Sequence, residues 1–254
     1  MKSARIAYAG GIHLASEHNG LPRLADGRVL AEDAVIWLPP VEPGTIFALG
    51  LNYADHAREL DFKAPAEPLV FLKGPRSLCG HRGQTLRPSA VAYMHYECEL
   101  AVVLGKTARK VSRSAAYEYV AGYTVANDYA IRDYLENYYR PNFRVKSRDF
   151  ATPLGPWLVD AADIADPMNL SLRTLVNGRV VQEGVTRDMI FDIPSLIAYL
   201  TEFMTLSPGD MILTGTPQGL SGVNVGDEVV TEIEGIGSLK NTIIGDSEDR
   251  AHVG

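Results

Sequence analysis

Cysteine is scarce in this chain. Only Cys79 and Cys98 occur among its 254 residues, which is too few for a disulfide framework, and their spacing matches no zinc or redox motif. We therefore expect both to be reduced thiols. The sequence also lacks an N-terminal apolar segment with a small-residue cleavage site, and nowhere do about 18 uncharged apolar residues follow one another. These absences predict a cytoplasmic protein without a targeting segment and without a membrane partner.

An excess of positive charge is also missing. The chain has 24 basic and 31 acidic residues, which gives a net charge of −7. This charge argues against nucleic acid or anionic lipid as a partner. An anionic small molecule could still bind in a local basic pocket. With 46% hydrophobic residues, the chain is long enough to bury a sizeable core in one large domain with a small appendage.

Short apolar segments separated by turn residues dominate the chain. Residues 5–37 have the pattern of a small β meander, and the proline-rich run 38–44 predicts a linker. We therefore expect a small N-terminal β region at 1–43, a catalytic domain at 44–246 and a disordered tail at 247–254.

Within the main domain, strands are expected to outnumber helices. Asn177-Gly178 predicts a hairpin turn, and short helices are expected at residues 53–60 and after a Ser112 or Ser114 cap. The clearest helix covers residues 192–206. Its apolar stripe is formed by Ile193, Leu196, Ile197, Leu200, Phe203 and Met204.

Two carboxylates stand at the head of an apolar run in MHYECELAVVLG. Side chains alternate along a strand, so Glu97 and Glu99 point together while Cys98 points away. Such a pair can be a solvated strand face, but the apolar run favours a shared cation, and Mg²⁺ prefers oxygen ligands of this kind. Asp128, which ends another apolar stretch, is a candidate third ligand or an ordinary turn residue.

Further candidate site residues lie on either side of these carboxylates. His56 and Glu59 are three apart in a short predicted helix, so they form either a proton-transfer pair or a surface ion pair. Thr216 lies in the turn TGTPQG, whose hydroxyls and backbone could hold a carboxylate. The cations Lys73, Arg132 and Lys146 are candidates for binding an anion, although each could be a solvated charge, and Arg76 and Arg140 are considered as further partners for a substrate carboxylate from their location alone.

Taken together and in this order, the motifs resemble the fumarylacetoacetate hydrolase family. They are G-x-N-Y-x-x-H-x-x-E, F-x-K-x-P, H-x-E-x-E-L, G-Y-x-x-x-N-D-x-x-x-R, K-S-x-D and L-x-x-G-D-x-I-L-T-G-T-P-x-G, and they cover about residues 45–246. The resemblance implies a mainly β fold with few helices, a mixed β-roll around the metal, and usually a dimer.

The resemblance also implies roles for residues of this chain. Three carboxylates would ligate Mg²⁺ or Mn²⁺, two residues would form the acid/base pair, and Lys146 would lie near metal and substrate. Three further residues would line the substrate site. The three metal ligands would be Glu97, Glu99 and Asp128, and the acid/base pair would be His56 and Glu59. The residues lining the substrate site would be Lys73, Arg132 and Thr216. The upstream aspartate ligand and longer N-terminal domain of the family's hydrolases are not evident, which counts against carbon–carbon hydrolysis.

The stretches VANDYAIRDYLENYYRPN and TRDMIFDIPSLI are similar to family members that isomerise and decarboxylate unsaturated acids of aromatic catabolism. The resemblance thus implies a small anionic 2-oxo or 2-hydroxydienoate substrate and a homodimer, or a pair with a similar N-terminal-type subunit. Other 2-oxo acid chemistry of the family, oxaloacetate decarboxylation or acylpyruvate hydrolysis, stays open. So does a catalytically silent partner subunit.

Overall fold

The computed structural model describes residues 1–135 and 142–246. The tail predicted at 247–254 lies outside these residues. An eleven-stranded mixed sheet has the order β3-β2-β1-β13-β11-β10-β16-β5-β6, with β4 paired to β1 and β7 paired to β13. Its strands are β1 (Lys2–Tyr8), β2 (Gly11–His18), β3 (Leu21–Arg23), β4 (Ile36–Leu38), β5 (Ile46–Gly50), β6 (Leu69–Lys73), β7 (Leu78–Cys79), β10 (Cys98–Leu104), β11 (Val120–Asn127), β13 (Thr152–Asp160) and β16 (Met211–Leu213).

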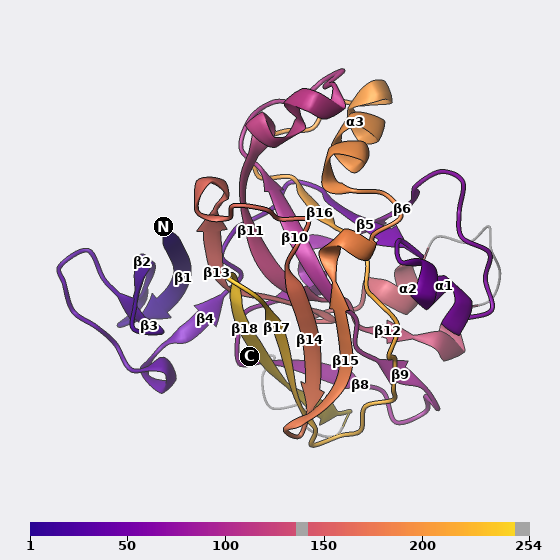
Figure 1. Cartoon of the computed structure of the whole chain (residues 1–254). Coiled ribbons are helices and arrows are strands. Elements are labelled where there is room, and N and C mark those ends of the chain that lie inside the picture. The colour runs from indigo at the N-terminus through magenta and orange to yellow at the C-terminus, as the bar shows by residue number, and fades with distance from the viewer. Residues whose placement is uncertain (136–141, 247–254) are drawn as a thin grey trace.

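A five-stranded sheet, ordered β15-β14-β17-β18-β8, packs against the face of β10, β11 and β13 (Figure 1). Its strands are β8 (Gly83–Arg87), β14 (Ser171–Val176), β15 (Arg179–Val185), β17 (Glu228–Ile233) and β18 (Gly237–Gly245). The predicted turn between β14 and β15 is confirmed, because Asn177 and Gly178 both have positive φ. A small ladder joins β9 (Met94–His95) to β12 (Ala130–Ile131).

Helices are few, as expected. The α-helices are α1 (Ala54–Glu59), α2 (Phe143–Lys146) and α3 (Ile193–Phe203), and the 3₁₀ helices are η1 (Glu32–Ala34), η2 (Pro75–Ser77), η3 (Arg113–Tyr119), η4 (Arg132–Tyr134), η5 (Ala161–Asp163) and η6 (Thr186–Asp188). None of the helices in the described ranges is long and apolar enough to cross a bilayer.

Some details of the helix predictions were wrong, and the helix predicted at 192–206 ends at Phe203, with Met204 already extended. The segment after Ser112 is the 3₁₀ helix η3, which has no side-chain cap because the Ser112 hydroxyl bonds the Ser114 hydroxyl instead. Strand β11 begins directly after η3, at Val120. Phe203 is 60% exposed, because a turn of 100° per residue puts it about 80° from Ile193, at the edge of the apolar stripe. The other stripe positions within α3 are buried.

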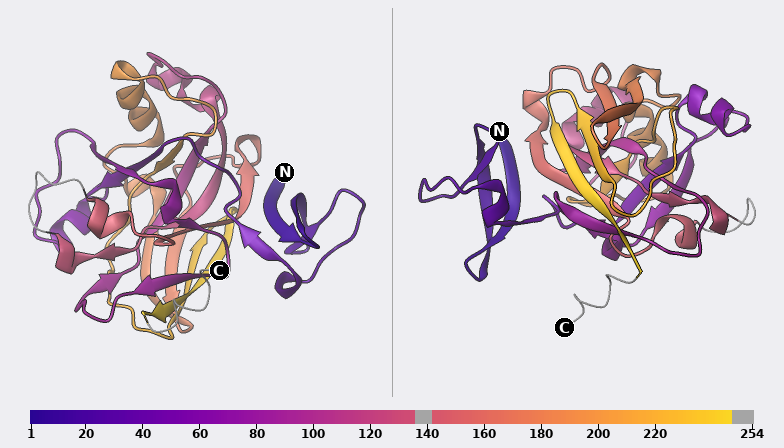
Figure 2. Two further views of the ribbon diagram at one scale, coloured as in Figure 1. Left: turned by 180° about the vertical axis from the view of Figure 1, so that it is seen from behind. Right: turned by 90° about the horizontal axis from the view of Figure 1, so that it is seen from below.

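The first four strands form a lobe at one side of the molecule (Figures 1 and 2). The lobe is joined to the rest by backbone pairing of Lys2 with Val159 and of Ser3 with Leu158. Trp37 of β4 also packs edge-on against Trp157 of β13, with ring centroids 5.3 Å apart. The N-terminal strands therefore extend the large sheet.

Candidate metal centre and active site

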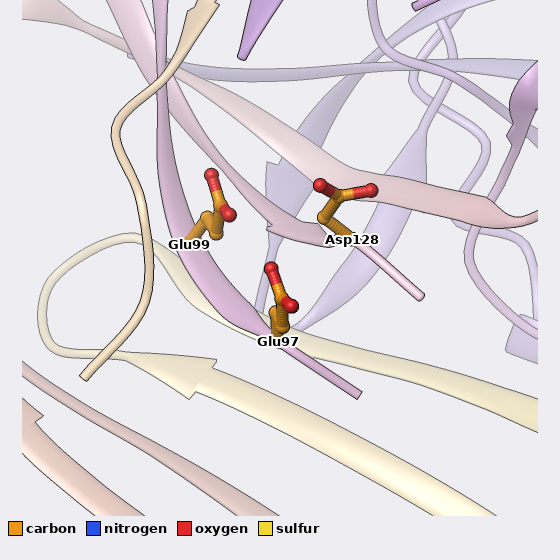
Figure 3. A group of neighbouring side chains, drawn as sticks. All are labelled: Glu97, Glu99 and Asp128. Atoms are coloured by element: carbon orange, nitrogen blue, oxygen red, sulfur yellow. The ribbon is translucent and has the colours of Figure 1, made fainter. Parts of the chain in front are cut away.

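Three carboxylates meet where β10 begins and β11 ends (Figure 3). The two strands are antiparallel and Cys98 pairs with Asn127, so the start of one lies beside the end of the other. Glu97, Glu99 and Asp128 are buried, and each offers an oxygen within 4.8 Å of the others. The three side chains singled out from the sequence therefore form one cluster.

Backbone contacts fix this cluster. The Gly215 amide donates to Oε2 of Glu99 at 2.9 Å, and the Glu97 amide donates to Oδ1 of Asn127 at 2.9 Å. The Asp128 amide donates to the Glu97 carbonyl at 2.9 Å. Oε1 of Glu99, in contrast, makes no hydrogen bond within the described part of the chain. A buried carboxylate oxygen without a partner fits a cation ligand.

Two buried lysines face the carboxylates. Lys146, at the end of α2, places Nζ 2.6 Å from Glu97 and 3.0 Å from Asp128, and Lys73 places Nζ 2.5 Å from Asp128. Lys73 also donates to the Lys146 carbonyl. Burial and the neighbouring Lys146 charge lower the pKa of Lys73, whereas the carboxylates outweigh burial and raise the pKa of Lys146.

The two glutamates respond to this environment in opposite ways. Burial works to raise the pKa of Glu97, but Lys146, His95 and Arg132 outweigh it and lower that pKa to about 2. Burial and the charges of Asp128 and Glu97 raise the pKa of Glu99 well above its usual range. Among the described residues, Glu99 thus has no positive partner of its own, and a hard divalent cation such as Mg²⁺ or Mn²⁺ would supply one.

Glu97 of this cluster lines a cavity of about 360 Å³. Its polar side chains include four of the residues singled out from the sequence besides Glu97, and Asn142 adds a further polar group to a wall that is otherwise mostly apolar. The lining residues are Leu49, Gly50, Leu51, His56, Phe62, Leu69, Phe71, Glu97, Arg132, Leu135, Asn142, Lys146 and Thr216. This arrangement suits a ligand with an anionic head and an apolar body.

His56 and Glu59 of α1 form the expected pair. Nδ1 of His56 lies 3.2 Å from Oε2 of Glu59. The other oxygen, Oε1 of Glu59, accepts hydrogen bonds from the amides of Gly219 and Leu220 at 3.0 Å each. Glu59 therefore orients the imidazole and ties α1 to the loop that carries Thr216, leaving Nε2 of His56 as the nitrogen available for proton transfer.

His95 is a site residue whose role the sequence did not reveal. Arg132 donates from Nε to Nε2 of His95 at 2.8 Å, so Nδ1 carries the proton and donates to the Tyr96 carbonyl at 3.1 Å. Burial, helped by the Arg132 and Lys146 charges, lowers the pKa of His95 to about 3. The neutral imidazole thus aims Arg132 at the cavity.

The remaining candidate cations lie in different surroundings. Lys73 is fully buried against Asp128 and is not among the cavity-lining residues of the described chain. Arg76, considered as a partner for a substrate carboxylate, is exposed in η2 and does not line the cavity either. Arg140, considered for the same role, lies outside the described residues.

Comparison with known proteins gave a family match and close relatives. Residues 45–244 match the model described as fumarylacetoacetate (FAA) hydrolase C-terminal. The 4-hydroxyphenylacetate degradation bifunctional isomerase/decarboxylase of Salmonella dublin is 61% identical over 246 residues, which are 94% of this chain and 57% of the relative. The chain thus spans little more than half of that relative's length.

Two solved structures match almost end to end. A 5-carboxymethyl-2-hydroxymuconate delta-isomerase from Mycobacterium smegmatis has a TM-score of 0.85 at 36% identity, covering 97% of this chain and 99% of that one. A maleylpyruvate hydrolase from Sphingobium sp. SYK-6, in complex with manganese(II) ion and pyruvate, has a TM-score of 0.83 at 28% identity, covering 96% and 99%. The mainly β fold is therefore that of these neighbours.

Proposed function

Because the chain belongs to the fumarylacetoacetate hydrolase family, we propose that it is a divalent-metal-dependent isomerase and decarboxylase of aromatic catabolism. Its substrates would be 5-oxopent-3-ene-1,2,5-tricarboxylate, which it decarboxylates, and 2-hydroxyhepta-2,4-diene-1,7-dioate, which it isomerises to 2-oxohept-3-ene-1,7-dioate. The observation that carries this proposal is that His56, which Glu59 orients, and Glu97 of the acidic cluster line one cavity.

The charges of the site support an anionic substrate. Among the described residues, the three carboxylates are matched by the cations Lys73, Lys146 and Arg132. A divalent ion held by Glu97, Glu99 and Asp128 would therefore leave the site positive. Such an ion supplies a Lewis acid that stabilises negative charge on a 2-oxo oxygen.

Both reactions then use the same side chains. Loss of CO₂ from the tricarboxylate leaves an electron pair conjugated with the 2-oxo group, and the carbon that lost CO₂ becomes carbon 5 of the diene. Isomerisation adds a proton at that same carbon 5, while the 2-hydroxyl loses its proton. Nε2 of His56, oriented by Glu59, would carry this proton.

Other groups of the cavity would hold the substrate still. Lys146 and Arg132 would offset carboxylate charge, and Thr216 would donate a hydrogen bond to a carboxylate oxygen. The apolar side chains of Phe62 and Phe71 would exclude water from the conjugated carbons. Lys73, which contacts Asp128, would act on the substrate only through that ligand.

The test is a spectrophotometric assay with each substrate, with Mg²⁺ or Mn²⁺ and with a chelator. We expect metal-dependent turnover of both compounds. Turnover of the dienoate alone would leave an isomerase. Activity on acylpyruvates or oxaloacetate instead would move the function to one of the alternatives. Of these two, the likeness to a maleylpyruvate hydrolase favours acylpyruvate hydrolysis. Silence with all of them would indicate a partner subunit without chemistry.

We also propose that the protein acts in the cytoplasm as a homodimer. Since the Salmonella dublin relative is nearly twice as long as the matched region, a pair with a similar N-terminal-type subunit is the other assembly that fits. Light scattering on the purified chain separates these cases, because a homodimer has twice the mass of one chain without any added partner.

A further inference from the structure

The loop that carries Thr216 is held by hydrogen bonds on several sides. Asn52 donates to the Thr214 carbonyl at 2.8 Å, Glu99 accepts from the Gly215 amide, and Glu59 accepts from the Gly219 amide. Metal-cluster and acid/base residues therefore meet at this loop. One further side chain, from β15, contacts its centre.

That side chain is Gln182, which is 2% exposed and uses its amide fully. Oε1 accepts from the Cys98 amide at 3.2 Å and from Oγ1 of Thr174 at 2.9 Å. Nε2 donates to Oγ1 of Thr216 at 2.9 Å and to the Pro217 carbonyl at 2.8 Å. Gln182 thus bridges Cys98, which lies between the two metal-candidate glutamates, and the loop.

The orientation of this amide follows from its backbone partners. A backbone amide such as that of Cys98 only donates, and a carbonyl such as that of Pro217 only accepts, so the two ends of Gln182 cannot be exchanged. Thr216 must therefore accept from Nε2. Its hydroxyl proton is then not used by Gln182, and Thr216 makes no other side-chain hydrogen bond within the described residues.

We propose that Gln182 is a positioning residue that turns the Thr216 hydroxyl proton toward the cavity, where it donates to a carboxylate oxygen of the substrate. The inference rests on the proposed function only in that the ligand is a 2-oxo carboxylate. Thr216 lines the cavity although it is 2% exposed, and the described residues provide no hydrogen-bond acceptor for its hydroxyl proton, so a ligand oxygen in the cavity would accept it. Gln182 lies behind Thr216 and acts through it.

The packing around Gln182 explains why the loop keeps this arrangement. A Cβ on Gly219 would lie 2.9 Å from the Val181 carbonyl oxygen and 3.0 Å from Cα of Gln182. The loop therefore lies directly on β15, and its backbone cannot shift toward the strand without a clash.

The experiment is a double-mutant cycle with Gln182→Leu and Thr216→Val. The readouts are KM and kcat for the dienoate, and the Kd of pyruvate measured by calorimetry with Mn²⁺. Because a hydrogen bond to a charged oxygen is lost, each single variant should raise Kd and KM about ten-fold. The double variant should also show about ten-fold, not the product of the two effects, and kcat should change less than KM.

The matched control is Thr174→Val, which removes a hydrogen bond from the other end of the same amide. We expect it to lower the melting temperature while Kd and KM stay within about two-fold of wild type. Circular dichroism checks folding, and Gln182→Asn replaces Gln182→Leu if the latter does not fold. A destabilised Gln182 variant with wild-type Kd and KM, or effects that multiply in the double variant, would overturn the inference.

The two readouts separate this inference from the proposed function. Wild-type binding of pyruvate with the expected coupling, but without turnover of either proposed substrate, would reject the function and keep Gln182 as a positioning residue. Turnover without coupling would do the reverse. Absence of both turnover and pyruvate binding would reject both.

Discussion

Glu99 is the residue whose surroundings most require a cation. Its Oε1 atom has no partner among the described residues, and burial together with the neighbouring carboxylates raises its pKa. Glu99→Gln keeps the shape and an acceptor for the Gly215 amide but removes the charge, so Mn²⁺ affinity should fall at least about ten-fold and metal-dependent activity should vanish. Calorimetry with Mn²⁺ measures this, with the exposed Glu228→Gln as control. Full turnover by Glu99→Gln in chelator would remove the metal from the mechanism.

His56 carries the second prediction at this scale. Its Nδ1 atom lies within hydrogen-bond distance of Glu59, and His56 is not one of the three acidic ligand candidates. His56→Ala should lower isomerisation by about 100-fold or more, as for the loss of a general acid/base, and should leave Mn²⁺ affinity unchanged. Stopped-flow absorbance of the dienoate and calorimetry test the two halves. Isomerisation at the wild-type rate would show that another group moves the proton.

At the scale of elements, strand β15 packs against the loop that carries Thr216. Gly184 lies in β15, and a Cβ there would be 2.7 Å from Cβ and Cγ of Pro217. Since Pro217 is rigid and its carbonyl is held by Gln182, Gly184→Ala should cost about 1–3 kcal/mol of unfolding free energy and raise KM. Chemical denaturation provides the measurement. Gly74→Ala, which meets nothing within 4 Å, is the control, and equal stability of the two variants would contradict the packing argument.

Local sequence patterns predicted the elements that depend on near neighbours. The Asn177-Gly178 hairpin follows from turn chemistry, and the shared direction of Glu97 and Glu99 follows from strand alternation. The contact of Gln182 with Thr216 joins residues 34 positions apart. It depends on how two sheets pack, and a lone glutamine in a hairpin carries no local signal of it. The role of His95 was missed because its contact with Arg132 joins residues 37 positions apart, through the pairing of β9 with β12.

At the scale of the whole molecule, a buried histidine connects the N-terminal lobe to the main body. Nε2 of His81 donates to Glu32 of η1 at 2.7 Å, and its Nδ1 accepts from the Lys240 amide at 3.1 Å. Arg82 also pairs with Glu32, at 2.7 Å. Burial, assisted by the Arg82 and Lys240 charges and opposed by Glu32, lowers the pKa of His81. Protonation would set a new Nδ1–H against the Lys240 amide donor.

This geometry predicts how stability depends on pH. Since the folded-state pKa of His81 lies below its ordinary value of 6.5, the stabilisation is complete above about pH 6.5 and declines as the pH falls from there toward the folded-state pKa. His81→Asn keeps an acceptor for the Lys240 amide but cannot titrate, so the loss of unfolding free energy between pH 7.5 and 5 should become shallower, by at most about 1.4 kcal/mol per pH unit. Urea unfolding at each pH measures the slope of unfolding free energy against pH. His95 contributes to this slope both in the wild type and in His81→Asn. The exposed His18→Asn should keep the wild-type slope, and an unchanged slope in His81→Asn would show that His81 does not link protonation to unfolding.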